Sequence, residues 1–235
     1  MKPFFLTDSA KHLSGNFPQP QTVRDVLGLF NRDEKLGFLR LWVSEGIPFA
    51  FSNVPLLYEA MRGYVSRRLL VPPKVLTMIG SARLGYSLSP LPDFGKAFGN
   101  HSDLDLSLVH EDVFRRLERD FNAWKGDWES GATKPRNKAE ERYWTENVRR
   151  LPINMSRGFV DPYKIPLHQQ YATAQLIGEV LFVALRKLQI TVGAPPVSKI
   201  SLRVYRTWDA LLLQMELNLH STLISFVKAS PHPIQ

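Results

Sequence analysis

Apolar residues recur three or four positions apart in several stretches of the chain, which is the spacing of an amphipathic helix packed on a core. The stretches are residues 23–45, 54–70, 113–128, 166–189 and 208–226. Pro72-Pro73 ends the second stretch because proline cannot continue a helix, and Gly193 to Pro196 breaks the fourth. Residues 129–142 are polar, and we expect an exposed loop or a helix end there.

Three other stretches have the character of β-strands. Lys74 to Ile79 is short and apolar and runs into Gly80-Ser81, a turn signal. Leu104 to Val109 alternates apolar and polar residues as a half-buried strand does, and Lys199 to Tyr205 is the third candidate. A few strands with helices before, between and after them predict an α+β fold, with an α/β fold as the alternative.

Composition narrows the class of protein. The 235 residues are 44% apolar and 11% aromatic, which is enough for a packed core. The absence of cysteine excludes disulfides, cysteine nucleophiles and thiolate metal sites. We read no apolar run of the roughly 18 residues that span a bilayer, and Met1 to Asp8 has too short an apolar stretch for a signal peptide. We therefore expect a soluble, cytoplasmic protein without a membrane partner.

The candidate chemistry begins with two aspartates, Asp103 and Asp105, at and within the second predicted strand. Residues two apart on a strand point to the same face, so the two carboxylates project together from Cα atoms roughly 6–7 Å apart. Such a pair can hold Mg²⁺ or Mn²⁺, because these ions prefer oxygen ligands and keep water and substrate phosphates as further ligands. Asp-x-Asp alone is not specific, because it occurs often in solvated turns and calcium loops.

The turn after the first predicted strand supplies the second element. Gly80 allows a sharp turn and close approach of the backbone to a ligand, and the Ser81 hydroxyl is a donor to phosphate oxygen. Arg83 follows at once and is a candidate phosphate partner, and Ser102 directly precedes the acidic pair. We therefore group Gly80, Ser81, Arg83 and Ser102 as expected nucleotide contacts.

Together these motifs resemble a known superfamily. Ile79-Gly80-Ser81-Ala82-Arg83 followed by Ser102-Asp103-Leu104-Asp105-Leu106 resembles the Gly-Ser and Asp-x-Asp motifs of the DNA polymerase β-like nucleotidyltransferases. The resemblance covers about residues 54–115. It implies a small mixed sheet flanked by helices, a Mg²⁺ ion, and transfer of a nucleoside monophosphate from a nucleoside triphosphate.

This resemblance also divides the chain. We expect an N-terminal arm and helix over residues 1–53, a nucleotidyltransferase core over 54–128, and a helical region over 129–235 that contributes one late strand and packs on the core.

The chain departs from the family pattern at two points. The interval between Ser81 and Asp103 is longer than usual, and its insert, Gly85 to His101, is either a substrate-gating loop or a surface excursion. The family also has a third carboxylate on a later strand, for which Asp161 and Asp209 are the candidates here. Asp161 precedes a proline and is equally typical of a turn, and Asp209 of a helix N-terminus.

The formal charge of +8 indicates an affinity for polyanions. The residues we expect to contact phosphate or nucleic acid near the site are Arg67, Arg68, Lys74, Arg203 and Arg206. A solvated basic surface accounts for the same residues without a ligand.

Two functions follow for this chain. The first is transfer of a nucleoside monophosphate from Mg-NTP to a hydroxyl of an RNA, a nucleotide, a small molecule or a protein. By family analogy this implies a bacterial toxin–antitoxin or anti-phage system, with an antitoxin or a defence-system subunit as protein partner. The alternative is a catalytically weak subunit that binds a nucleotide or nucleic acid within a larger complex. A purely structural helical protein, with Asp103 and Asp105 in a solvated turn, is the third interpretation.

Overall fold

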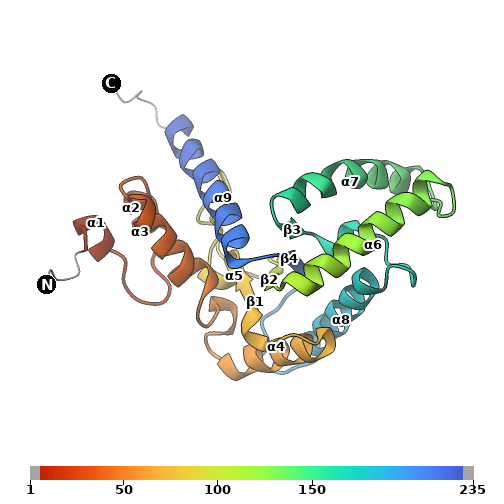
Figure 1. Cartoon of the computed structure of the whole chain (residues 1–235). Helices are drawn as coiled ribbons and strands as arrows, with labels where there is room; N and C mark the ends of the chain where they lie inside the picture. Colours follow the sequence, from red (N-terminus) through yellow and green to blue (C-terminus); the bar gives the residue numbers. More distant parts are fainter. Residues whose placement is uncertain (1–5, 230–235) are drawn as a thin grey trace, which may run out of the picture.

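A four-stranded mixed sheet lies at the centre of the chain in the computed structural model, which describes residues 6–229 (Figure 1). Its strand order is β1-β2-β4-β3. The strands are β1 (Leu76–Ile79), β2 (Leu104–Val109), β3 (Phe159–Val160) and β4 (Ile200–Tyr205). β2 runs antiparallel to β1 and parallel to β4, and β3 runs antiparallel to β4. The expected α+β fold with a small mixed sheet flanked by helices is confirmed.

The two faces of the sheet differ at Asp105. Leu104, Leu106 and Leu108 of β2 are buried, whereas Asp105 between them points to the other face. Across the sheet, Asp105 is paired with Ile79 of β1 on one side and Ser201 of β4 on the other. Residues paired directly across two strands share a face, so these side chains surround the aspartate.

Helices account for most of the remaining chain. They are α1 (Asp8–Lys11), α2 (Pro20–Leu27), α3 (Arg32–Phe38), the π-helix η1 (Leu39–Ser44), α4 (Pro55–Leu69), α5 (Ser81–Leu84), α6 (Glu111–Glu129), α7 (Lys138–Ser156), α8 (Ala172–Gln189) and α9 (Trp208–Ala229), with short 3₁₀ turns η2 (Phe49–Phe51), η3 (Pro73–Val75) and η4 (Pro162–Lys164). In Figure 1, α1–α3 and α9 lie to the left of the sheet and α6–α8 lie to the right.

Two hydrophobic cores hold these helices in place. The larger one joins the apolar face of the sheet to α4, α6, α7 and α8. The smaller one joins α2, α3, η1 and α9 to the opposite face of the sheet. Each core therefore contains residues from before and after the central strands. The segment 129–235 contributes two strands to the sheet, β3 and β4, where one was expected.

The helix α7 was not predicted, because its sequence is polar and contains Pro152. The helix begins where the Asn137 side chain accepts a hydrogen bond from the Glu140 amide, which is a helix cap. Its buried side includes Trp144, Leu151 and Met155, at spacings of seven and four residues. The N-terminal stretch 23–45 also differs from expectation, because it is divided into α2, α3 and η1 rather than forming one helix.

Among the described residues, α9 is the only helix long and apolar enough to cross a membrane. This differs from our reading that no such stretch exists. The helix qualifies by length and composition alone, and core helices of soluble proteins pass the same test. One side of α9 is buried in the smaller core through Leu211, Met215 and Leu219. Residues 1–5, which belong to the stretch judged too short for a signal peptide, lie outside the described residues.

Candidate functional site

Asp105 is the centre of the candidate site. Its Oδ1 atom accepts a hydrogen bond of 2.6 Å from the Ser201 hydroxyl of the neighbouring strand. Its Oδ2 atom lies against the turn after β1, where a Cβ added to Gly80 would be 3.2 Å away. The two contacts fix the carboxylate between β1 and β4. The half-buried Asp105 also lines two separate cavities.

The turn at Gly80 depends on glycine for two reasons. Its backbone angles, φ +72° and ψ −155°, belong to a region that is essentially restricted to glycine. Its lack of a side chain also leaves room for the Asp105 carboxylate. The backbone at Gly80 therefore lies close to Asp105, and the expected close approach to a ligand stays a prediction.

The larger cavity, of about 510 Å³, opens beside Gly80 and Asp105. It is lined by Leu39, Val43, Ile79, Gly80, Ser81, Ser87, Leu88, Ser89, Pro90, Asp105, Met215, Asn218, Leu219, Ser221 and Thr222. Five of these residues carry a hydroxyl and none is lysine or arginine. The cavity therefore offers hydrogen bonds and one carboxylate, but no positive side chain.

The insert between the two motifs forms one wall of this cavity, together with α9. The Thr222 hydroxyl donates a 2.6 Å hydrogen bond to the Leu88 carbonyl, and the Leu91 amide donates to the Ser225 hydroxyl at 3.0 Å. The Phe94 ring meets the Phe226 ring edge to face at 4.8 Å. These contacts hold part of the insert on α9, and neither a gating loop nor a surface excursion is tested by them.

Asp103 directly precedes the first residue of β2 and lies outside both cavities. Its carboxylate is about one-third exposed and lies 3.5 Å from the Lys199 ammonium. A shared strand face was expected for the two aspartates, but β2 begins at Leu104, so the shared face stays a prediction. Only Asp105, however, opens into the cavity that contains Ser81.

Asp161 lines the smaller cavity, of about 250 Å³, together with Asp105, but its carboxylate is paired with basic side chains. Asp105, Asp161, Lys199 and Arg203 all line this cavity. Asp161 is only 2% exposed, and its carboxylate is 2.6 Å from Arg203 Nε and 2.9 Å from Lys164 Nζ. Burial disfavours the charged Arg203, but the Asp161 carboxylate and the Tyr205 hydroxyl together raise the pKa of the guanidinium. Asp161 is therefore committed to a buried ion network.

Asp209 is excluded by the direction of the strands. β2 and β4 run parallel, with Leu104 opposite Ile200 and Val109 opposite Tyr205. Asp103 precedes the start of β2, whereas Asp209 follows the end of β4. A strand of six residues spans about 17 Å, so the two acids lie at opposite ends of the sheet. Within residues 6–229 no group of three His, Cys, Asp or Glu side chains could hold a metal ion.

Arg83 and Ser102 line neither of the two cavities at Asp105. Arg83 is 3% exposed, and its guanidinium donates hydrogen bonds to the carbonyls of Ile47 at 2.8 Å and Leu41 at 3.2 Å. Burial lowers the pKa of Arg83. The Ser102 hydroxyl, also buried, accepts a hydrogen bond from the Gly99 amide at 3.1 Å. The expected nucleotide contacts at both positions are therefore wrong, because each side chain stabilises a neighbouring loop instead.

The expected basic residues do not surround the site. Arg67 and Arg68 are exposed on α4, which packs on the apolar face of the sheet. Lys74 precedes β1 and Arg206 follows β4, at the ends of these strands remote from the paired residues Ile79, Asp105 and Ser201. Only Arg203 lines a cavity with Asp105. Their clustering near the site is wrong, whereas polyanion binding elsewhere stays a prediction.

Two parts of the site were missed from the sequence. Ser201 meets Asp105 because β4 pairs with β2, and strand alternation would have placed Ser201 on that face once the strand order was known. Asn218 and Thr222 line the cavity from α9, and no local motif marks them.

No protein-family model, no curated protein and no solved structure matches this chain. The proposal of a function therefore rests on the geometry of the site alone, at Gly80, Ser81, Asp103 and Asp105.

Proposed function

We propose that the chain binds a nucleoside triphosphate with Mg²⁺ at Asp103 and Asp105 and transfers the nucleoside monophosphate to an acceptor hydroxyl. The observation that supports this most is the position of Asp105. Its carboxylate lies against the Gly80 turn at the edge of a cavity of about 510 Å³. This volume lies within the roughly 300–1,000 Å³ of small-molecule sites.

The donor set fits a metal that arrives with its substrate. Mg²⁺ in nucleotide sites is commonly held by one or two carboxylates, with waters and phosphates as the other ligands. Asp105 on β2 and Asp103 directly before the strand are the two carboxylates that would hold it. A bound Mg²⁺ would supply charge neutralisation for the phosphates, which suits a cavity lined by neither lysine nor arginine.

The residues of the chain have distinct roles in this proposal. Gly80 gives the phosphates close access to the backbone, and the Ser81 hydroxyl donates to a phosphate oxygen. Ser201 orients the Asp105 carboxylate through its hydrogen bond. The Ser89 hydroxyl and the Asn218 amide contact the nucleoside. The oxygen of the acceptor hydroxyl then bonds to the α-phosphorus, the bond from the α-phosphorus to pyrophosphate breaks, and the hydroxyl proton passes to solvent.

The alternative is nucleotide binding without transfer, and one observation favours it. The position opposite Asp105 on β4 is Ser201, so this neighbouring strand supplies a hydroxyl rather than an acid. Asp161, the nearest candidate acid, is neutralised by Arg203 and Lys164. A serine cannot accept the acceptor's proton as a carboxylate does.

Labelled nucleotides distinguish the two functions. The protein is incubated with Mg²⁺ and each NTP labelled at the α-phosphorus, with and without total RNA, and the γ-labelled NTPs serve as controls. Transfer predicts a labelled RNA, protein or small product from the α-label only, and its loss in Asp105→Asn. Asp112→Asn, an exposed acid on α6, is the matched control. Binding without any labelled product supports the alternative, and neither binding nor product refutes both.

A further inference from the structure

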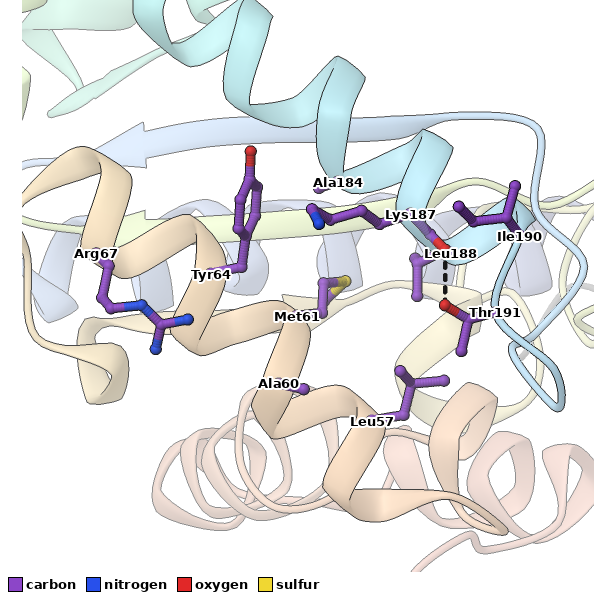
Figure 2. A pocket seen from close by; sticks show the side chains of 10 residues that line it. All are labelled: Leu57, Ala60, Met61, Tyr64, Arg67, Ala184, Lys187, Leu188, Ile190 and Thr191. Atoms are coloured by element: carbon purple, nitrogen blue, oxygen red, sulfur yellow. Dashed lines mark hydrogen bonds between the residues drawn. The ribbon is translucent and has the colours of Figure 1, made fainter.

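A second hollow lies on the other side of the molecule, between α4 and α8 (Figure 2). Its volume is about 380 Å³. It is lined by Leu57, Ala60, Met61, Tyr64, Arg67, Ala184, Lys187, Leu188, Ile190 and Thr191. Both helices cover the apolar face of the sheet, so this hollow is separate from the cavity at Asp105.

The floor of the hollow is apolar. Met61, Ala184 and Leu188 belong to the larger hydrophobic core and are almost fully buried. The rim is continued by Ile190, whose side chain is 80% exposed. Exposed isoleucine beside an apolar hollow is a surface that gains from being covered, because its burial removes apolar area from water.

Two positively charged side chains line the same hollow. Arg67 from α4 and Lys187 from α8 both line it, and within residues 6–229 neither has a carboxylate oxygen within 4 Å. Gly63 makes room for Arg67, since a Cβ there would lie 3.2 Å from Arg67 Nη1. A glycine inside a helix lowers the stability of the fold by about 0.5–1 kcal/mol relative to alanine. The space for the Arg67 guanidinium is therefore gained at the expense of stability.

Tyr64 helps to define the ligand. The Lys187 ammonium lies 5.5 Å from the centre of its ring, and the Arg68 guanidinium lies 5.9 Å from it. A nucleic-acid base stacked on this ring would have to displace one of these cations. A small anion that binds the cationic groups themselves does not need to stack on this ring.

We propose that the hollow between α4 and α8 binds a small organic anion with an apolar body, such as a medium-chain carboxylate. In this proposal the apolar part lies over Met61 and Leu188, and the anionic group accepts hydrogen bonds from the lining cations Arg67 and Lys187. The volume is at the lower end of the roughly 300–1,000 Å³ of ligand pockets, which suits a short body. The proposal is independent of the nucleotide site.

The test uses decanoate against the fluorescent sulfonate 8-anilinonaphthalene-1-sulfonate. We expect the dye to bind the wild-type protein and decanoate to displace it. Arg67→Gln with Lys187→Gln should weaken decanoate at least about tenfold, because two charge-assisted hydrogen bonds are lost. Ala60→Trp, which fills the hollow from an exposed helix position and keeps both charges, should abolish displacement.

The controls separate specific binding from general attraction. Arg142→Gln with Arg149→Gln removes the same charge from exposed positions of α7 and should leave decanoate binding unchanged. Decanol binding as tightly as decanoate, or an unchanged affinity in the Arg67 and Lys187 variant, overturns the proposal. Displacement of the dye by a uridine oligonucleotide but not by decanoate also overturns it and assigns the surface to nucleic acid.

Discussion

Replacing Gly80 by alanine tests whether the turn and Asp105 form one unit. The substitution forces a side chain into φ +72° and ψ −155°, which costs on the order of 1–3 kcal/mol. It also places a Cβ 3.2 Å from Asp105 Oδ2, so the carboxylate must move by a few tenths of an ångström. Alanine restricts the unfolded chain as well, which offsets about 0.4–1 kcal/mol. We expect a net loss of about 1–2 kcal/mol in the free energy of unfolding.

Urea denaturation of a matched pair of variants measures this effect. Gly126→Ala is the control, because Gly126 is exposed inside α6 and its added Cβ would meet nothing within 4 Å. That control should stabilise the protein by about 0.5–1 kcal/mol. Nucleotide affinity is then measured without urea, at a temperature where both variants are folded. It should fall only in Gly80→Ala.

Two results for Gly80→Ala would contradict these expectations. If Gly80→Ala unfolds at the same urea concentration as the wild-type protein, the turn does not require glycine. If it is destabilised but binds nucleotide as wild type does, the contact between Gly80 and Asp105 has no role in the site.

Three further predictions concern the stability of the fold. Asp161→Asn should destabilise the protein by about 3 kcal/mol in urea denaturation, because it leaves the partly buried Arg203 unpaired; a loss below about 1 kcal/mol contradicts this. Burial raises the pKa of Tyr86, and its hydroxyl has no partner in the described part of the chain, so Tyr86→Phe should stabilise by about 1 kcal/mol at neutral pH. Because the folded state favours the neutral phenol, wild-type stability should fall as pH rises above the ordinary tyrosine value of about 10, and less so in Tyr86→Phe; equal alkaline loss refutes this. Asn137→Ala should cost about 1 kcal/mol by removing the cap that Asn137 provides to the Glu140 amide, and an unchanged unfolding midpoint shows that the cap is dispensable.

The strands β1, β2 and β4 were predictable because their signals are local, whereas the two-residue strand β3 was missed. Alternation along Leu104–Val109 places Asp105 on the face opposite Leu104 and Leu106, and Gly80 follows directly from a buried strand. The helices α4, α6, α8 and α9 were also predicted near their observed bounds, since each buries one apolar side.

The remainder depends on contacts between distant parts of the chain. Ser201 reaches Asp105 only because β4 pairs with β2, and nothing near either residue specifies that pairing. Arg83 is two residues from Ser81, yet its side chain turns away to the carbonyls of Leu41 and Ile47. Sequence proximity to a motif therefore predicts where a backbone lies, but not which group its side chain contacts.

Equilibrium binding of nucleotide to wild-type protein and to the Asp103→Asn, Asp105→Asn double variant tests the central proposal most directly. Each NTP is titrated by calorimetry with Mg²⁺ and again with the metal chelated, and circular dichroism verifies that the variant is folded. The proposal predicts that wild-type protein binds at least one NTP only with Mg²⁺, and that the double variant loses at least about tenfold in affinity, because amides are poor Mg²⁺ ligands. Absence of binding for every NTP, or wild-type affinity in the folded double variant, contradicts it.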